Sequence, residues 1–178
     1  MPIEFELCQD PQLLEQYYQL RQKCFRQELK LPDFDGSEDE RDREGQILIA
    51  RIGDRCVGGA RIVPDSTMQY QVNEMALASE ACCMWERFVF DPVVRTVQMI
   101  RDFCAELIDA SRQFGYDYAL VLSSRRNARF YRQCHSALGV EFDIHCRMPD
   151  AAQGVFSGLE HYLSISKLSR ANAVQIAA

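Results

Sequence analysis

The chain has 178 residues, a length typical of one domain with a proper hydrophobic core. Hydrophobic residues make up 47% and charged residues 26%, the composition of an ordinary soluble globular protein. A formal net charge of −6 argues against general nucleic-acid binding. The sequence has no apolar run near the roughly 20 residues of a membrane helix and no signal-peptide pattern at its N-terminus. We therefore expect a single domain over residues 1–178 that binds neither membrane nor nucleic acid.

The cysteines and histidines do not have the spacing of metal ligands or of a disulfide framework. No C-x-x-C pair occurs, and Cys24 and Cys104 fall on the apolar stripes of two expected helices. Free cysteine behaves as a small hydrophobic residue, so we expect reduced, buried thiols and a cytoplasmic protein. The other residues considered are Cys8, Cys56, Cys82, Cys83, Cys134, Cys146, His135, His145 and His161. We predict no metal site.

A short strand over residues 3–7 and a long helix open the chain. Asp10 is typical of an N-cap, and Pro11 suits the first helical position. Apolar residues then recur at helical spacing until the helical pattern ends near Leu31 and Pro32. We interpret the acidic segment 33–45 as a surface loop.

A β-hairpin follows the acidic segment. Residues 46–52 and 55–64 are predicted strands, and the connection between them, Gly53-Asp54, has the length of a two-residue hairpin turn. The pair Gly58-Gly59 inside the second strand predicts a bulge or a close approach of another group to the backbone.

The centre of the chain is a predicted βαβ unit. Residues 85–90 form an apolar strand, and Asp91-Pro92 marks its end. Apolar residues at three- and four-residue spacing predict a buried helix of about six turns from Val93, with Gly115 at its C-terminal cap. Residues 118–124 form the next strand, which should run parallel to the first. The start of the helix then lies beside the end of the first strand and offers free N–H groups to an anion.

The remaining elements complete a mixed α/β sheet. A helical turn over 73–79 precedes the central unit. A helix over 127–138, a strand over 140–147, a loop over 148–158, a strand over 160–168 and a frayed tail after 169 follow it. Strands and helices do not alternate regularly, so the sheet is not doubly wound.

Charged residues in apolar surroundings mark a candidate site. Arg61 and Arg87 stand in predicted strands, where a buried arginine needs an acceptor or an open cleft. Asp39 and Asp42 form a D-x-x-D pair in the acidic segment. These four residues can pair in one functional site, or they can form a purely structural ion-pair network.

Four segments resemble the N-acyl-homoserine-lactone (autoinducer) synthases in order and approximate spacing. They are residues 20–25, 38–42, 58–64 and 87–91, and the resemblance spans roughly residues 13–139. It implies the Gcn5-related N-acetyltransferase (GNAT) fold, an α/β fold with a mixed central sheet flanked by helices. In that fold two parallel strands splay apart to admit an acyl thioester.

The resemblance also implies a site for the amine substrate, which is S-adenosylmethionine in that family. The residues that match are Arg21, Phe25, Asp39, Asp42, Arg61 and Arg87. Leu31 stands at the family's tryptophan position and Met84 at its glutamate position, with Glu86 nearby as a substitute. Asp39, Asp42 or Glu86 would position or deprotonate the amine, and backbone N–H groups at a bulge in the central strand would polarise the thioester carbonyl.

The acyl donor is predicted from the segment before the long helix. The GNAT fold usually carries a glycine-rich loop there for the pyrophosphate of coenzyme A, but residues 92–97 contain no glycine. An acyl carrier protein brings one phosphate and an acidic surface, which nearby arginines would attract. These are Arg95, Arg101, Arg125, Arg126, Arg129 and Arg132, and a solvated basic surface is the alternative. Tyr131 resembles the helix tyrosine that protonates the leaving thiolate in many acetyltransferases of this fold, or it is a packed helix residue.

The sequence therefore predicts an acyltransferase that moves an acyl group from a carrier-protein or coenzyme A thioester to an amine, with no permanently bound cofactor. S-adenosylmethionine is the leading acceptor, and the product would be a signalling lactone. Two alternatives remain: a coenzyme A-dependent N-acetyl- or N-acyltransferase for another amine, and a non-catalytic binding domain that keeps the fold.

Overall fold

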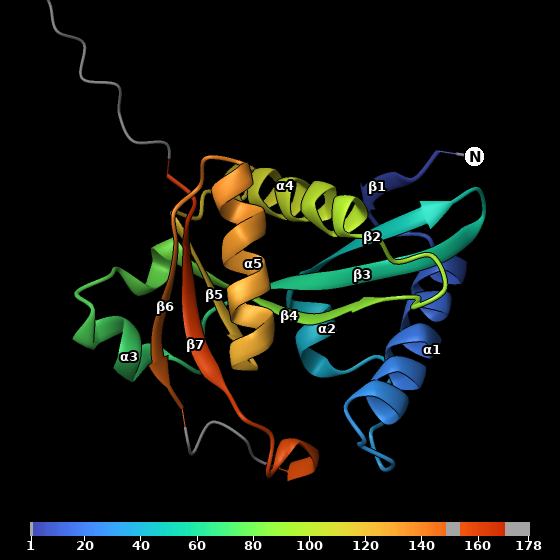
Figure 1. The fold of residues 1–178 in the computed structure, drawn as a ribbon, viewed down its shortest axis with the longest axis horizontal. Coiled ribbons are helices and arrows are strands. Elements are labelled where there is room, and N and C mark those ends of the chain that lie inside the picture. Colours follow the sequence, from blue (N-terminus) through green and yellow to red (C-terminus); the bar gives the residue numbers. More distant parts are fainter. Residues whose placement is uncertain (1, 149–153, 170–178) are drawn as a thin grey trace, which may run out of the picture.

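The fold is built on one mixed β-sheet. The computed structural model describes residues 2–148 and 154–169. Within them, seven strands lie in the order β1-β2-β3-β4-β5-β7-β6 (Figure 1). They are β1 (Glu4–Leu7), β2 (Gln46–Ile52), β3 (Arg55–Pro64), β4 (Cys82–Phe90), β5 (Tyr118–Ser123), β6 (Phe142–Arg147) and β7 (Tyr162–Lys167). Only β4 and β5 pair in parallel, which confirms the predicted mixed sheet.

Helices cover both faces of the sheet. The described helices are α1 (Pro11–Glu28), α2 (Glu40–Glu44), α3 (Gln69–Glu74), α4 (Val97–Gln113) and α5 (Arg125–Ala137), with 3₁₀ turns at Ser79–Ala81 and Gly154–Phe156. Successive residues of β2 point to opposite faces: Leu48 packs in one core cluster with α4 and α5, and Ile49 in another with α1. The sheet therefore separates an α4–α5 core from an α1 core.

The predicted start of α1 and the predicted end of α4 are confirmed. The Asp10 carboxylate accepts the N–H of Gln12 at 2.7 Å, so Asp10 is the N-cap of α1. At the end of α4, Gly115 has a φ of +85°. The N–H groups of Gly115 and Tyr116 donate to carbonyls in the last turn, at 3.0 and 3.1 Å, which is the hydrogen-bond pattern of a glycine C-cap.

The sequence suggested that the whole acidic segment is a loop, but part of it is helical. The Asp39 carboxylate accepts the N–H of Asp42 at 3.0 Å, and the Asp42 carboxylate accepts the N–H of Asp39 at 2.9 Å. This reciprocal capping box starts the five-residue helix α2. The prediction of a loop over residues 33–45 is therefore wrong for Glu40–Glu44.

The central helix begins later than its apolar spacing indicated. The Asp91 carboxylate accepts the N–H of Val93 at 3.1 Å, and the Asp91 carbonyl accepts the N–H of Arg95 at 3.0 Å. These bonds form a turn, and α4 starts only after Thr96, whose hydroxyl caps it. Val93 and Val97 are 85% and 57% exposed, so their assignment to the buried stripe was wrong.

Smaller differences concern the ends of elements. The predicted turn over 73–79 is the helix α3, which starts earlier, at Gln69. Helix α5 starts two residues earlier than predicted, because Ser124 caps it. Part of the predicted loop 148–158 and the tail after residue 169 lie outside the described residues.

The cysteines are free and mostly buried, as the sequence predicted. All eight cysteines are free thiols; seven are buried and Cys146 is partly exposed. Burial raises the pKa of Cys56 and Cys82 to about 11, so these thiols stay protonated near neutral pH and act as small core residues. Among the described helices, none is both long and apolar enough to cross a membrane.

Strands β4 and β5 part after a short parallel contact. They pair only at Cys82–Tyr118, Cys83–Ala119 and Met84–Leu120. Beyond these pairs β5 continues against β7 alone, as far as Ser123. The predicted parallel strands that diverge at one end are therefore confirmed.

A bulge lies in β4 where the strands have parted. Between the paired residues Glu86 and Val89, β4 places Arg87 and Phe88 opposite the single residue Ala60 of β3. Arg87 has a φ of +56°, which is rare for a non-glycine residue. The Tyr17 hydroxyl donates to the Arg87 carbonyl at 3.0 Å and holds the bulge from α1.

The Gly58-Gly59 pair allows close packing on both faces of β3, as predicted. A Cβ atom on Gly58 would lie 2.3 Å from the Phe90 ring, and one on Gly59 would lie 2.8 Å from the Tyr17 ring. Both rings are buried and leave no space for a methyl group.

We expect Gly58→Ala to lower the free energy of unfolding by about 2 kcal/mol, because the added methyl group overpacks the core against Phe90. Urea denaturation measures the change. Ser136→Ala, at an exposed position of α5, is the control and should shift stability by less than about 0.5 kcal/mol. Gly58→Ala with wild-type stability would contradict the close packing at β3.

Candidate functional site

A cavity opens where β4 and β5 diverge. Its volume is about 930 Å³, and residues from both faces of the sheet line it. Polar residues line one part: Arg41, Arg61, Glu86 and Arg87. Aromatic residues line another: Trp85, Phe88, Phe130, Tyr131 and Phe142. The cavity therefore connects a charged region on the α1 face with an apolar region beneath α4 and α5.

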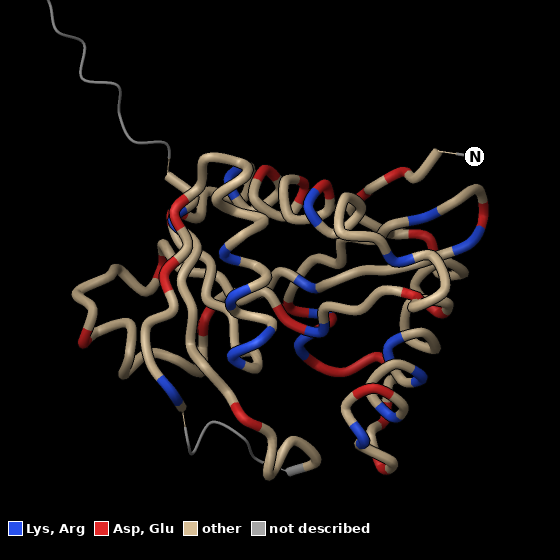
Figure 2. The backbone as a smooth tube through the Cα atoms, in the orientation of Figure 1, with Lys and Arg blue, Asp and Glu red and all other residues tan. Residues whose placement is uncertain are grey.

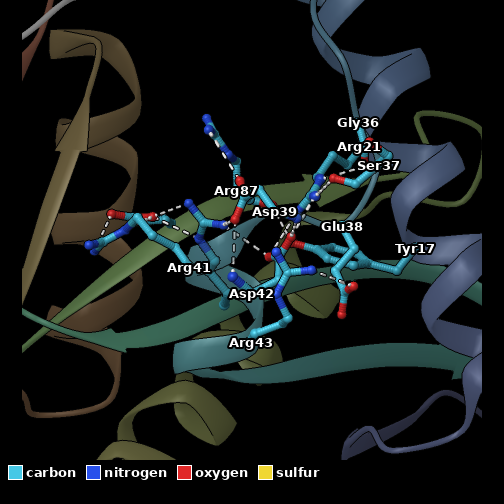
Figure 3. A network of polar contacts seen from close by, with 12 residues as sticks. Tyr17, Arg21, Gly36, Ser37, Glu38, Asp39, Arg41, Asp42, Arg43 and Arg87 are labelled. Carbon is cyan, nitrogen blue, oxygen red and sulfur yellow. Dashed lines mark hydrogen bonds and ion pairs between the residues drawn. The ribbon is translucent and has the colours of Figure 1, made fainter.

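Two fully buried arginines share one aspartate on the charged side. Arg21 of α1 and Arg61 of β3 are each 1% exposed. Arg21 binds both Asp42 oxygens, at 2.9 and 2.7 Å (Figure 3). Arg61 binds one of these oxygens at 3.0 Å. Arg21 also donates to the carbonyls of Gly36 and Ser37, at 2.9 and 2.5 Å. Each nitrogen of the Arg21 guanidinium thus has an acceptor inside the protein.

The pKa of Asp42 reflects this environment. Burial acts to raise it, but the hydrogen bond from Arg21, the N–H of Asp39 and the charge of Arg61 together bring the pKa of the carboxyl below its ordinary value. Asp42 therefore stays ionised at neutral pH and compensates both buried guanidinium groups.

Glu86 is held by two arginines. Its Oε2 accepts from Arg61 Nε at 2.7 Å, and its Oε1 accepts from Arg41 Nη2 at 2.8 Å. Arg61 also donates to Asp39 Oδ1 at 2.5 Å. Both Glu86 oxygens are therefore occupied by guanidinium groups.

Arg87 differs from the other arginines of the cluster. Its guanidinium packs against the rings of Phe25, Phe34 and Phe156, at 5.9, 5.2 and 4.6 Å from the ring centroids. The nearest carboxylate oxygen is Asp39 Oδ2 at 4.0 Å, and the buried Nε has no hydrogen-bond partner among the described residues. Burial lowers the pKa of Arg87, but an arginine stays charged at neutral pH.

The charges of the cluster do not cancel. Four arginines face three carboxylates, namely Arg21, Arg41, Arg61 and Arg87 against Asp39, Asp42 and Glu86. The excess positive charge falls on Arg87, which lines the cavity. A partly buried cation of this kind is suited to an anionic group of a ligand.

The apolar side of the cavity places Tyr131 beside the bulge. Its ring centroid lies 5.2 Å from that of Phe88. Desolvation raises the pKa of Tyr131 well above its ordinary value, so the phenol keeps its proton at neutral pH. Farther inside, Trp85 donates to the Ser111 hydroxyl at 2.9 Å.

The arginines predicted for a carrier protein do not all lie together. Arg95 and Arg126 line the cavity, and Arg95 pairs with Glu28 at 3.0 Å. Arg125 and Arg129 are exposed in the first turns of α5, where basic residues gather (Figure 2). Arg101 is half-buried on α4 and is not among the residues that line the cavity.

The segment before α4 uses its own backbone donors. The N–H groups of Val93, Val94 and Arg95 all donate to Asp91, one to its carboxylate and two to its carbonyl. The Asp91 carboxylate also pairs with Arg55. These N–H groups are therefore not free to hold a pyrophosphate, in agreement with the glycine-free sequence.

The sequence model of the N-acyl amino acid synthase FeeM matches residues 16–141. The chain belongs to this family. It is an N-acyltransferase, and no curated protein matches its sequence.

Solved structures share the fold of this FeeM family member. A putative N-acetyltransferase from Lactobacillus plantarum superposes with a TM-score of 0.70 and 13% identity, over 95% of this chain and 100% of that one. The acyl-homoserine-lactone synthase LasI gives 0.63 and 15%, over 94% and 90%. The coenzyme A-dependent synthase BjaI, with S-adenosylmethionine and isopentyl-CoA, gives 0.65 and 18%, over 89% and 77%. These likenesses establish the GNAT fold.

The structure brings most of the predicted amine-site residues of this FeeM family member together. Arg21, Asp39, Asp42, Arg61, Glu86 and Arg87 form one connected cluster, and Phe25 packs on Arg87. Three participants escaped the sequence analysis. Arg41 had a signal, because it stands between Asp39 and Asp42 in the acidic segment. Phe34 and Phe156 had none, since both fall in segments without a regular pattern.

No metal site accompanies the cluster in the described parts of the chain. Over residues 2–148 and 154–169, no group of three or more His, Cys, Asp or Glu residues is placed to hold a metal ion.

We expect Asp42→Asn to lower the free energy of unfolding by about 3 kcal/mol, because it leaves two buried guanidinium groups without their shared charge. Chemical denaturation followed by circular dichroism measures this change. Glu38→Gln breaks the exposed pair with Arg43 and should cost less than about 1 kcal/mol. Equal losses in the two variants would contradict a structural role of Asp42.

Proposed function

We propose that this protein acylates the α-amino group of an amino acid, with an acyl thioester as the donor. The observation that carries the proposal is the under-paired Arg87, set in its aromatic box at the charged end of the cavity. An α-amino acid brings a carboxylate to such a cation and an amine to the same place. The description of the family as N-acyl amino acid synthases supports this acceptor class.

Asp39 and Arg87 form a pair suited to the two charges of an amino acid. Asp39 Oδ1 is occupied by Arg61 and by the N–H of Asp42, but among the described residues Oδ2 has only Arg87, at 4.0 Å. The Asp39 side chain is 41% exposed and accessible to a ligand. In the proposed complex, the substrate carboxylate binds Arg87 and its ammonium binds Asp39 Oδ2.

The reaction needs a neutral amine beside a polarised thioester carbonyl. Asp39, directly or through a water molecule, accepts the ammonium proton, and the amine nitrogen then attacks the carbonyl carbon. Glu86 is held by Arg41 and Arg61, so we assign it the role of positioning Arg61.

Groups beside the bulge complete the reaction. Backbone N–H groups freed from the β-ladder at the bulge stabilise the oxyanion. When the C–S bond breaks, Tyr131 gives its proton to the leaving thiolate, and the second proton of the amine nitrogen, passed through water, restores the Tyr131 phenol. The protonated Tyr131 phenol and its position beside Phe88 support this role.

S-adenosylmethionine ends in the same α-amino acid group, so it belongs to the proposed class. Two residues favour an ordinary amino acid instead. The buried residues Leu31 and Met84 stand where the resemblance places a tryptophan and a glutamate of the homoserine-lactone synthases. An apolar Met84 in the cavity wall removes a charge that would face a sulfonium ligand.

For the donor, we propose an acyl carrier protein. The N–H groups of Val93, Val94 and Arg95 before α4 are bonded to Asp91, so they are not free to hold a pyrophosphate. Arg95 and Arg126 at the cavity, with Arg125 and Arg129 on α5, offer an acidic carrier a basic surface. An acyl-coenzyme A donor is the alternative, as in the structure of BjaI with isopentyl-CoA.

The acceptor is tested with Arg87→Met. We expect kcat/KM for amino acids to fall by about 10- to 100-fold, mainly through KM, because a charge-assisted hydrogen bond to the carboxylate is lost. Mass spectrometry of products from a panel of amino acids and S-adenosylmethionine measures the rates.

The matched control for Arg87 is an acceptor amine that lacks the carboxylate. Arg87→Met should change its acylation little, whereas equal loss for acids and amines would contradict carboxylate binding. Arg43→Gln, at an exposed position, should keep wild-type kinetics.

The donor is tested by competition between carrier-protein and coenzyme A thioesters of equal acyl length. We expect the carrier to be preferred, and the preference to shrink with added salt, because charges are screened over about 10 Å at 0.1 M. Arg126→Ala with Arg129→Ala should lower kcat/KM for the carrier more than kcat. Arg147→Ala, exposed on β6, is the control. Salt-insensitive turnover of acyl-coenzyme A by both the wild type and the double variant would refute a carrier protein as the donor.

A further inference from the structure

Three buried polar atoms beneath α5 have no hydrogen-bond partner among the described residues. They are His135 Nε2, Ser164 Oγ and Ser166 Oγ. The three side chains are 1%, 0% and 0% exposed. Buried polar groups in folded proteins are nearly always paired, with protein, water or a ligand, so three unpaired atoms in one region require an explanation.

The free nitrogen of His135 is a hydrogen-bond acceptor. Its Nδ1 lies 2.8 Å from the carbonyl oxygen of Tyr131, and a carbonyl only accepts, so Nδ1 carries the ring proton. Burial lowers the pKa of His135 to about 4, and the ring is therefore neutral at neutral pH. The Nε2 atom is left with a lone pair that calls for a donor.

The His135 ring belongs to the wall of the apolar part of the cavity, and the two serines lie on the same sheet face as two other lining residues. His135, Val121 and Phe142 line the cavity, and the His135 ring lies 4.5 Å from the Phe142 ring. Ser166 pairs with Phe142 on one side, and Ser164 pairs with Val121 on the other. Because paired residues of adjacent strands share a face, both hydroxyls lie on the sheet surface that carries these lining residues.

This region lies away from the place where the thioester would react. Trp85, whose ring is 5.8 Å from that of His135, stands three residues before Phe88 on β4, or roughly 10 Å along the strand. On α5, His135 lies one helical turn beyond Tyr131. An acyl chain that enters the cavity at the bulge therefore reaches His135 with its inner part, the carbon atoms that lie away from the thioester.

We propose that the inner part of this cavity selects an acyl chain that carries a hydroxyl group away from the thioester, and that the hydroxyl donates its hydrogen bond to His135 Nε2. A ketone has no proton to give to Nε2, and a plain alkyl chain leaves this nitrogen unpaired. This inference rests on the proposed acyltransferase function.

The test compares carrier-protein thioesters of one chain length that are unsubstituted, hydroxylated at successive positions, or oxidised to a ketone. We expect a hydroxyl on the inner part of the chain to raise kcat/KM about tenfold over the unsubstituted donor, and a ketone to give no such gain. His135→Phe should bring the ratio of hydroxylated to unsubstituted donor to about one. The control is Ser136→Ala, at the next and exposed position of α5, which should keep the wild-type ratio.

A second readout does not depend on turnover or on the variant. In protein with ¹⁵N-labelled histidine, a hydroxyacyl-pantetheine amide should shift the Nε2 resonance of His135, and its alkyl counterpart should not. Equal use of all donors together with an unchanged Nε2 resonance would overturn the inference and leave the polar atoms to bound water. Absence of acylation with every donor would instead refute the proposed function, while the Nε2 resonance still tests the hydroxyl contact.

Discussion

The carboxylate of Asp42, shared by two buried guanidinium groups, ties together elements that lie far apart in the sequence. Arg21 comes from α1, Arg61 from β3, and Asp42 itself also closes the capping box of α2. A five-residue helix is far too short to be stable alone, so α2 depends on these bonds. The same bonds fix Asp39, the preceding N-cap, beside Arg61 and Arg87. The buried carboxylate of Asp42 thus fixes the position of the exposed Asp39 carboxylate in the site.

The second constraint is the short parallel contact of β4 and β5. A sheet normally separates its two faces, but here the strands part after Met84 and the cavity runs through the gap. Beside the bulge, neighbouring side chains of β4 lie on different faces: Arg87 packs against Phe25, and Phe88 packs against Tyr131. The parted strand therefore supplies a charged group to the α1 face and an aromatic wall to the α5 face, which suits a reaction between a polar acceptor and an apolar donor.

The sequence predicted correctly those elements that depend on residues close together in the chain. The hairpin of β2 and β3 was correct because its turn and its apolar runs are contiguous in the sequence. The start of α4 was missed because Asp91 bonds to the following N–H groups and delays the helix, although Val93 and Val97 keep the helical spacing. The D-x-x-D pair also carried the signal of a capping box, which was missed. The box around Arg87 was beyond prediction, since Phe156 approaches from a distant segment without periodicity.

The sequence left two interpretations of its charged residues open, a structural network or a binding site, and the geometry divides the residues between them. Arg21, Asp42 and Arg61 are buried and bonded to one another, which is what a structural network requires. Arg87 lacks that compensation: it lies against three phenylalanine rings, its Nε has no partner in the described parts of the chain, and the nearest carboxylate oxygen there is 4.0 Å away. Burial without a partner destabilises a charged group, so a purely structural role gives no reason for this arrangement. The proposed substrate carboxylate gives such a reason, because it would complete the pairing of Arg87 only while the acceptor is bound.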